Sequence, residues 1–547
     1  TTPATVPEAA PELSEEEALI ARAQAPLLQG LGDHTHPISS DVPGVQRYFD
    51  QGMVMAAGFN HAEAVRAFQA AQRLDPDCAM CYWGEALATG PNINVTSKGK
   101  AIMLAEDRMS AHAAAQRALE LSASGVTERE RDYLKAQVTR YNGDPDTDRD
   151  ALDLAYADAM RTLANKYPDD DDAQALFAEA MMNTMPWNYW LDGDNPKPAT
   201  REVITALETV MARNPLHALS LHLYIHAVEA SSKPGRAEKA ADDLAHLVPG
   251  SGHLVHMPSH IYWRIGRYHD ASEANVRAAK VDEDYIAQCN AQGFYPALYY
   301  PHNIHFLWAS ASMEGRSEVA IEAGEKVARN VRMEQIEQYP AVEFFKTIPL
   351  LSLVRFARWP DIKVYPKPPE KLPYSLAIWH YARAVAMART GDLEGAAVEV
   401  ASMQPLMAND SIWFLDGNDY PASQILAVAD ALAQGELAQA RGDVDTAIAH
   451  FEKAVAGQDK LPYTEPPFWY YPTRQSLGHA LLLKQDYLRA EQVYRDDLAQ
   501  YPRNGWSMYG LALSLEGQGR AEEAQAMKDR FAGVWRLADV ELASSVL

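Results

Sequence analysis

The chain has 547 residues, a hydrophobic share of 47% and a charged share of 22%. These shares are those of a soluble folded protein, and the length suits several ordinary domains or one long solenoid. Its 49 basic and 74 acidic residues give a formal net charge of −25, so we expect no nucleic-acid partner. No apolar run approaches the roughly 18 residues of a membrane helix, so we expect no membrane span.

The beginning of the chain differs in composition from the rest. It starts with Thr1, and residues 1–17 are rich in Pro, Ala, Thr and Glu. This composition predicts a flexible acidic leader over residues 1–30. Two origins stay open for the first residue, trimming for expression or removal of an export signal. Export predicts a periplasmic or secreted bacterial protein, and the composition fits a cytoplasmic protein as well.

Helical repeats follow the leader. Positions 8, 20, 24, 27 and 32 of a 34-residue tetratricopeptide unit are filled by Gly52, Ala64, Phe68, Ala71 and Pro76. Small residues at positions 8 and 20 let the paired helices approach closely, and the proline ends the second helix. Near the other end of the chain, positions 7, 8, 20, 24 and 32 are filled by Leu477, Gly478, Ala490, Tyr494 and Pro502. The pattern predicts an all-α fold, a tetratricopeptide-like α-solenoid.

Proline-rich segments interrupt the repeats. Residues 359–373 hold five prolines and predict the boundary between an N-terminal block, 31–358, and a C-terminal block, 374–547. Residues 461–472 form a second Pro-rich and aromatic-rich insert. Long inserts in solenoids usually cover a binding face or fill the groove.

Six motifs carry a resemblance to a known family. They are GLGDHTHPI, FNHAEAVRAF, CAMCYWGEALATGPNIN, HLYIHAVEAS, GHLVHMPSHIY and YYPHNIHFL. These stretches resemble signatures of a family of exported bacterial tetratricopeptide-repeat (TPR) proteins, and the resemblance covers nearly the whole chain. It implies the repeat fold and an exported bacterial protein, but no reaction, so function has to be argued from a site.

Histidines recur at helical spacing in three segments. They are His222, His226 (followed by Glu229), then His253, His256, His260, and then His302, His305. The offsets from His222 to His256 and from His226 to His260 both equal the 34-residue repeat length. Equivalent positions one repeat apart lie side by side, and first helices line the concave groove. We therefore expect all seven histidines to converge on one groove surface.

This convergence predicts a transition-metal site, because neutral imidazole is the commonest ligand of copper, zinc and iron. Copper is favoured as the cofactor, with iron or zinc as alternatives. Glu229 could bind the ion, orient a histidine or act as the catalytic base. The alternative is that the histidines only pack and hydrogen-bond in a helical groove.

The predicted function is that of a metal-dependent oxidoreductase acting on a small-molecule substrate. A non-catalytic metal-binding or delivery protein and a repeat scaffold for a protein partner stay open as alternatives. Three further histidines are undecided: His34 and His36 form either a ligand arm or an exposed turn, and His61 favours a helix-start contact. For Cys78 and Cys81 we favour small-residue packing over a disulfide or a redox pair.

Overall fold

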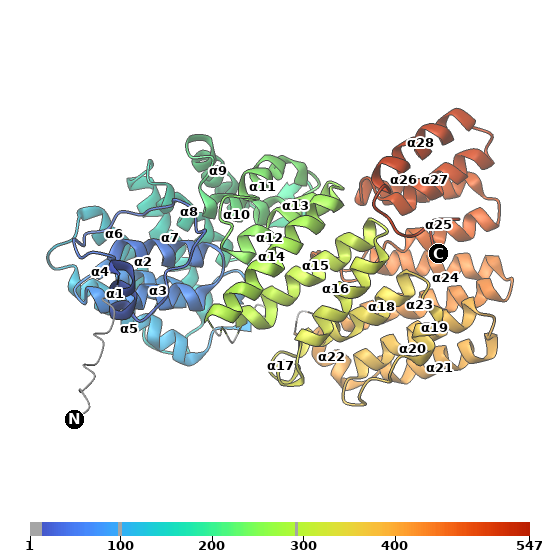
Figure 1. Ribbon diagram of the computed structural model, residues 1–547, viewed down its shortest axis with the longest axis horizontal. Helices are drawn as coiled ribbons and strands as arrows, with labels where there is room; N and C mark the ends of the chain where they lie inside the picture. Colours follow the sequence, from blue (N-terminus) through green and yellow to red (C-terminus); the bar gives the residue numbers. More distant parts are fainter. Residues whose placement is uncertain (1–13, 97–100, 290, 292–293, 419) are drawn as a thin grey trace, which may run out of the picture. The chain divides into compact units, whose positions relative to one another are not determined.

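The computed structural model describes residues 14–96, 101–289, 291, 294–418 and 420–547 (Figure 1). Within these residues the chain is almost entirely helical, and consecutive helices pack in pairs, which confirms the predicted all-α, tetratricopeptide-like fold. Two compact units are present. Unit 1 comprises residues 1–189, 196–223 and 247–251, and unit 2 comprises residues 190–195, 224–246 and 252–547.

Unit 1 contains the first repeats and the described part of the predicted leader. Residues 1–13 of that leader lie outside the described residues. Its later part forms helix α1, in which Ser14 and Glu17 make a reciprocal capping box and Leu19 is buried. The elements of unit 1 are α1 (Glu15–Ala23), α2 (Val45–Ala57), α3 (His61–Leu74), α4 (Ala79–Thr89), β1 (Val95–Thr96), β2 (Ala101–Ile102), α5 (Ala105–Leu121), α6 (Glu128–Val138), α7 (Arg149–Lys166), α8 (Asp171–Asn183), α9 (Pro198–Arg213) and the first part of α10 (Ala218–Val228).

Phe68 explains why glycine stands at position 8 of the first repeat. A Cβ atom added to Gly52 would lie 2.6 Å from the Phe68 ring, and one added to Gly84 would lie 2.3 Å from it. The ring on α3 therefore packs directly on the backbones of α2 and α4. At positions 52 and 84 it leaves room only for the hydrogen atom of a glycine. This close approach is what the small residues of the repeat pattern provide.

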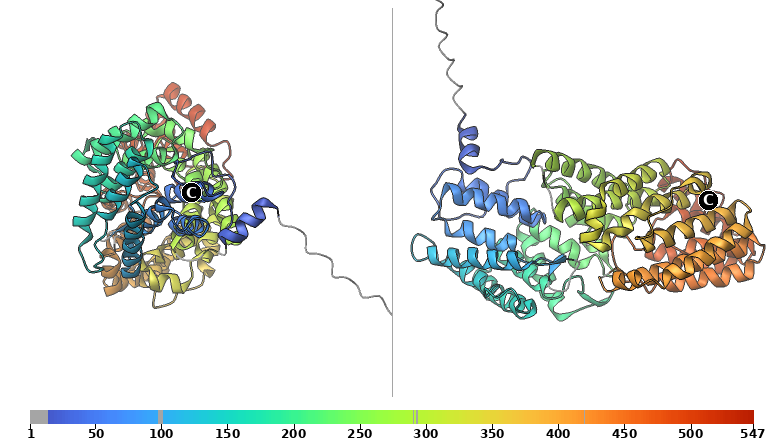
Figure 2. Two further views of the ribbon diagram at one scale, coloured as in Figure 1. Left: turned by 90° about the vertical axis from the view of Figure 1, so that its left-hand side faces the viewer. Right: turned by 90° about the horizontal axis from the view of Figure 1, so that it is seen from below.

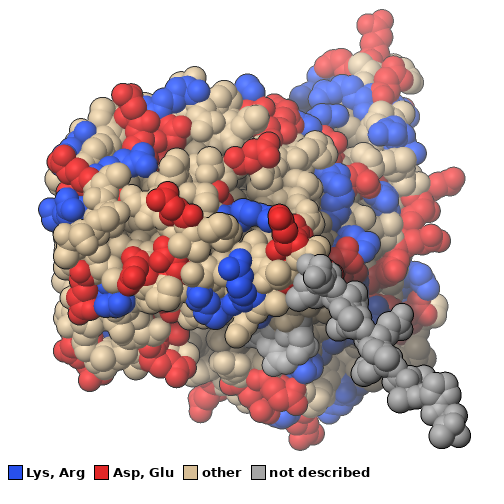
Figure 3. Space-filling view, turned by 60° about the vertical axis from the view of Figure 1, so that its left-hand side comes forward, with Lys and Arg blue, Asp and Glu red and all other residues tan. Residues whose placement is uncertain are grey.

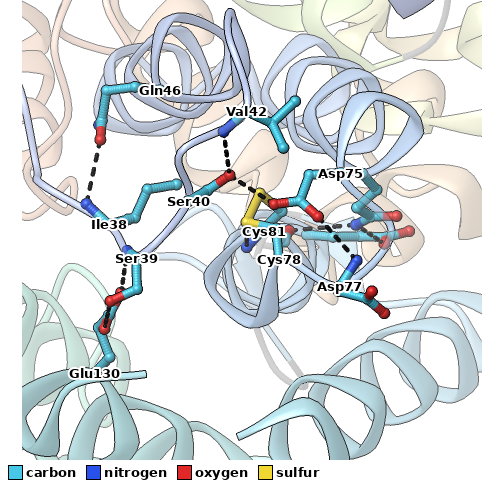
Figure 4. The surroundings of a disulfide bond; sticks show 12 residues. Ile38, Ser39, Ser40, Val42, Gln46, Asp75, Asp77, Cys78, Cys81 and Glu130 are labelled. Carbon is cyan, nitrogen blue, oxygen red and sulfur yellow. Dashed lines mark hydrogen bonds between the residues drawn. A yellow bond between two sulfur atoms is a disulfide. The ribbon is translucent and has the colours of Figure 1, made fainter. Parts of the chain in front are cut away.

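The disulfide between Cys78 and Cys81 corrects the sequence interpretation, which favoured simple packing (Figure 4). The two residues flank the first turn of α4, three positions apart, where a thiol pair is close enough to bridge. Nearby, the Ser40 hydroxyl donates to Asp75, and Ser39 donates to Glu130 through its N–H and its hydroxyl. These bonds hold the segment before α2 against the helices of unit 1.

Unit 2 contains the remaining repeats, among them the helices α20 to α24, which are labelled in Figure 1 and appear in the same yellow and orange in Figure 2. Its elements are β3 (Trp190–Asp192), the end of α10, η1 (Pro234–Ala237), α11 (Glu238–Leu244), α12 (Gly252–His256), α13 (Pro258–Arg264), α14 (Tyr268–Cys289), η2 (Tyr295–Tyr299), α15 (Tyr300–Met313), α16 (Ser317–Asn330), α17 (Met333–Gln338), η3 (Pro340–Thr347), α18 (Ile348–Arg355), α19 (Trp359–Val364), α20 (Pro373–Arg389), α21 (Leu393–Met407), α22 (Asp410–Asp416), α23 (Ala422–Ala440), α24 (Val444–Gln458), α25 (Arg474–Leu483), α26 (Tyr487–Gln500), α27 (Gly505–Gly517) and α28 (Ala521–Val534). Strand β4 (Asn195–Pro196) pairs with β3.

The close packing of unit 1 recurs in unit 2. The ring of Tyr494 on α26 lies against Gly478 of α25 and Gly510 of α27, where added Cβ atoms would come within 2.4 Å and 2.3 Å of it. The turns between paired helices use glycine for a second reason. Gly315 and Gly391 have φ values of 72° and 84°, in the left-handed region that costs other residues energy.

The predicted domain boundary at residues 359–373 lies inside unit 2. Helix α19 begins at Trp359 and packs on α18 and α20, so this segment connects consecutive helices of one unit. Its prolines stop each helix without separating two cores. The division found instead passes through α10, between Leu223 and Tyr224.

Acidic and basic side chains are interspersed over the face of the molecule shown in Figure 3. Exposed ion pairs, such as that of Lys280 with Asp284, occur among the described residues. In the part of the chain that the structure describes, the helices are each too short or too polar to cross a bilayer.

Candidate metal centre

The histidine-bearing helices of unit 2 alternate with partner helices, as the repeat pattern predicts. His226 lies near the end of α10, and His302 lies in the first turn of α15. The segment that carries His253, His256 and His260 forms two short helices, because Pro258 has no N–H to continue the hydrogen-bond ladder. His256 therefore ends α12, and His260 stands in the first turn of α13.

Glu229 joins two of these segments. Its Oε1 lies 2.8 Å from Nδ1 of His226, and its Oε2 lies 2.6 Å from Nδ1 of His260. All three residues are buried, and the carboxylate accepts a hydrogen from each ring. Each imidazole is thereby fixed as the Nδ1–H tautomer, which leaves its Nε2 lone pair available to a ligand.

His256 and His260 face one another through their Nε2 atoms, which are 2.9 Å apart. The Nδ1 atom of His256 lies 2.6 Å from Oδ1 of Asn275, which accepts its hydrogen. With both Nδ1 atoms committed to acceptors, two Nε2 lone pairs converge on one point. Either an additional proton or a cation has to lie there, since two bare lone pairs repel each other.

His302 approaches the same point from α15. Its ring centroid lies 4.7 Å from that of His256 and 5.8 Å from that of His260. One nitrogen from each of the three rings lies within 4.8 Å of the others. The His302 ring is half-buried, whereas the other two are buried, so the cluster reaches toward solvent at this corner.

His253 extends the cluster without joining its centre. Its ring packs edge-on to Tyr299 at 4.9 Å and lies 5.7 Å from the ring of His256 and 6.4 Å from that of His226. His226 itself lies 5.4 Å from His260, ring to ring, which confirms the adjacency predicted from the 34-residue offset.

The buried charges shift the pKa values of the cluster strongly. Burial alone would raise the pKa of Glu229, but the charges of His260 and His226 and their hydrogen bonds outweigh it and hold the pKa below its usual range. Burial would lower the pKa of His260, and the neighbouring carboxylates raise it instead. For His256, burial and the charge of His260 together hold the pKa well below 6.5. These directions place the additional proton on Nε2 of His260, which donates it to the bare Nε2 of neutral His256.

Glu465 is the site residue that the histidine pattern could not reveal. It lies in the insert 461–472, and its Oε2 is 3.3 Å from Nδ1 of His260. Tyr463 donates to the other carboxylate oxygen. Burial raises the pKa of Glu465 to about 7, despite the hydrogen bond from His260. The only sequence signal for this position was the expectation that the insert covers a binding face.

His305 is the predicted ligand that the structure does not bring to the cluster. Its ring stacks on Trp308 at 5.2 Å and lies edge-on to Phe344 and Phe345. Burial among these rings lowers its pKa to about 3, so it is a neutral core residue. It lies three residues after His302, and the helix turns it about 60° away, which is enough to direct it into the aromatic core.

His222 belongs to unit 1. Its Nδ1 atom donates to the Ala57 carbonyl at 2.6 Å, and its ring packs on Phe59 at 4.5 Å. Its predicted adjacency to His256 joins the two units and stays a prediction. His34, His36 and His61 also belong to unit 1, where His61 opens α3 as expected.

Neither a family model nor a curated protein matches the chain. Among solved structures it is similar to a human IFIT1 dimer with m7Gppp-AAAA, at 13% identity over 97% of this chain and 96% of that one, with a TM-score of 0.31. It is also similar to the APC/C hetero-tetramer Cut9-Hcn1 (14% identity, 91% of each chain, TM-score 0.27) and to Naa15/Naa10 bound to HypK-THB (10% identity, 90% and 76%, TM-score 0.25). At these scores the likeness carries no argument, so the repeat fold rests on the chain's own helices.

Proposed function

We propose that the protein binds a transition-metal ion through His256, His260 and His302. With this ion it acts as a metal-dependent oxidoreductase. The observation that carries the proposal is the 2.9 Å approach of the two Nε2 atoms, each on a ring whose Nδ1 is held by an acceptor. Two imidazole nitrogens bound to one tetrahedral ion lie about 3.3 Å apart, so a small opening of this pair admits the ion.

The donor set favours copper. Three imidazoles without a carboxylate suit copper, whereas participation of Glu465 would favour iron or zinc. A bound copper or iron ion would supply one-electron chemistry at the half-buried corner beside His302. Small-molecule substrates would reach the cluster from that corner.

The residues around the ion have distinct roles in this proposal. Glu229 is a positioning residue, because both of its oxygens already hold imidazole hydrogens. Glu465 is the candidate acid–base group. Its Oε2 lies 3.3 Å from Nδ1 of His260, and a pKa of about 7 lets it take up or release a proton near neutral pH.

Export is part of the proposal and has one supporting observation. The disulfide between Cys78 and Cys81 is of a kind that persists in oxidising compartments. A periplasmic or secreted location would also suit a redox-active metal protein. Trapping of free thiols in protein freshly isolated from its source, before and after reduction, tests whether the pair is oxidised there.

A protein-binding scaffold is the second candidate function. Trp413 and Phe414 on α22 are 61% and 56% exposed, which is unusual for adjacent large aromatic residues. A scaffold needs no metal, so the two functions separate experimentally.

The direct test is metal analysis of the purified full chain, combined with electron paramagnetic resonance. We expect about one copper or iron ion per chain, with hyperfine coupling to imidazole nitrogen if copper is bound. Reaction with oxygen or peroxide then separates an enzyme from a delivery protein. A chain that stays metal-free after equilibration with Cu²⁺, Fe²⁺ and Zn²⁺ would contradict the proposal and leave the scaffold function.

A further inference from the structure

A second group of histidines surrounds one carboxylate in unit 1. The segment that carries His34 and His36 lies before α2, Asp172 lies in the first turn of α8, and His217 precedes α10. These residues come from three separate parts of unit 1. None of them belongs to the centre described above.

The carboxylate of Asp172 is contacted on both oxygens. Its Oδ1 lies 3.0 Å from Nε2 of His217 and 3.5 Å from Nε2 of His34, and its Oδ2 lies 2.7 Å from Nδ1 of His36. Burial would raise the pKa of Asp172, but the hydrogen bonds from His217 and His36 outweigh it and hold the pKa well below its usual value. The Asp172 carboxylate is therefore an anion surrounded by three imidazole rings.

We propose that His34, His217 and Asp172 form a second binding site for a divalent transition-metal ion. One ligand atom from each residue lies within 4.8 Å of the others. Two imidazole nitrogens and one carboxylate oxygen on a single face, with the remaining positions open, are the donor set of many iron and zinc sites.

The surroundings of this triad fit a metal ligand set. His36 is not a ligand in this arrangement, because its ring is packed among Phe49, Trp83 and Tyr133. It holds Oδ2 of Asp172, whereas Oδ1 faces the Nε2 atoms of His34 and His217, the other two proposed ligands. Such outer hydrogen bonds orient carboxylate ligands in metal sites.

Ser220 allows the ring of His217 to exchange a proton for an ion. The Ser220 hydroxyl lies 2.8 Å from Nδ1 of His217. The Ser220 N–H also donates to Nδ1, at 3.3 Å, so in the structure the ring hydrogen is on Nε2 and bonds to Asp172. When Nε2 binds an ion, the hydrogen moves to Nδ1, the backbone bond is given up, and the hydroxyl accepts from Nδ1–H, since a hydroxyl can donate or accept. His34 is 22% exposed, so an ion can enter from solvent past this ring.

A zinc titration of the full chain tests the second site independently of the first. Zn²⁺ binding is measured by equilibrium dialysis and by Co²⁺ absorption in four proteins: wild type, His256→Ala, His34→Ala and the double variant. We expect His34→Ala to lose one zinc ion, or to weaken it at least 10-fold, both in the wild-type background and in the His256→Ala background. His112→Ala, at a half-buried histidine elsewhere in unit 1, should bind as wild type does.

The outcomes separate the two sites and the structural alternative. If wild type and His256→Ala bind the same number of zinc ions, the proposed first centre is contradicted. The second site is still supported in that case if His34→Ala binds one ion fewer. Unchanged zinc stoichiometry and affinity in His34→Ala would overturn the second site. A fall in its melting temperature with unchanged zinc would show instead that the cluster only fastens the segment around His36 to α8.

Discussion

The Nε2 atoms of His256 and His260 lie 2.9 Å apart. The orientation of each ring is fixed by a hydrogen bond from its Nδ1 atom, to Asn275 for His256 and to Glu229 for His260. These hydrogen bonds are stronger evidence for a binding site than the distance itself. An imidazole that could rotate or change tautomer would relieve the repulsion between two lone pairs by turning away. Here both rings are buried and fully oriented, so the convergence is built into the packing of unit 2.

Replacement of His256 by alanine should remove the metal bound at this centre. The variant loses one of two converging donors, and even outer-shell changes cost about 10–100-fold in affinity, so a loss of at least that size is expected. The measurement is metal content after equilibration with Cu²⁺ and exhaustive dialysis. His450→Ala, at a half-buried position on α24, serves as the control and should retain its metal. Equal contents in the two variants would contradict the site.

Glu229→Gln tests the proposed positioning role. Glutamine offers one acceptor and one donor where Glu229 offers two acceptors, so the ring of His226 or of His260 would meet an N–H with its own Nδ1–H. That ring must change tautomer and place a hydrogen on Nε2. We expect metal affinity to fall on the order of 10–100-fold with helix content unchanged by circular dichroism. Glu238→Gln, at a half-buried carboxylate in the same unit that pairs with Arg267, should bind metal normally.

Much of this centre could be predicted from spacing alone. The 34-residue offset placed His226 beside His260, because a tandem repeat puts equivalent residues on neighbouring helices. The same periodicity located Phe68 and Tyr494 against the backbones of flanking helices. The repeat length predicts the contacts that occur in every repeat.

The remainder depends on contacts that no period encodes. Glu465 reaches the cluster from an insert of irregular backbone, and His305 turns into a core of Phe344, Phe345 and Trp308 although it lies one helical turn from His302. The predicted boundary at 359–373 lies inside unit 2. Prolines indicate where helices end, but they do not show whether the helices on either side share a core. Here α19 packs on both α18 and α20.

Removal of the metal should destabilise the protein without unfolding it. An ion that binds only the folded chain stabilises it by mass action, by about 2.7 kcal/mol at a free concentration of 100 times Kd. Chelation is therefore expected to lower the melting temperature by several degrees while far-ultraviolet circular dichroism stays nearly constant at 20 °C. His256→Ala should show no such response at this centre. A melting curve unchanged after verified removal would identify the histidines as ordinary packing residues.

Gly478→Ala should destabilise unit 2, because the added Cβ would lie 2.4 Å from the Tyr494 ring. Overpacking of this kind typically costs about 1–3 kcal/mol. Gly533→Ala is the matched control. It lies within α28, where an added Cβ meets no atom within 4 Å, and it should stabilise by about 0.4–1 kcal/mol. Melting curves of the two variants should therefore shift in opposite directions, and a shift in the same direction would count against the repeat packing.

Asp282 should make the protein less stable as pH rises toward neutrality. Burial raises its pKa from 3.8 to about 7, although Tyr295 and Asn303 donate hydrogen bonds to it. Between these two values the folded chain holds a proton that the unfolded chain has released. The free energy of unfolding therefore falls as pH rises from about 4 to about 7, by at most about 4 kcal/mol.

Asp282→Asn imitates the protonated carboxyl group and should remove this dependence. We expect the variant to match wild type near pH 4 and to melt at a higher temperature than wild type at pH 8, because only wild type must then bury a charge. Asp284→Asn, two residues further along α14 at an exposed position, should show the wild-type pH dependence. Melting curves of the three proteins, recorded at half-unit steps between pH 4 and 8, provide the measurement. A difference between wild type and Asp282→Asn that stays constant over this range would show that the Asp282 pKa is not raised in the folded protein.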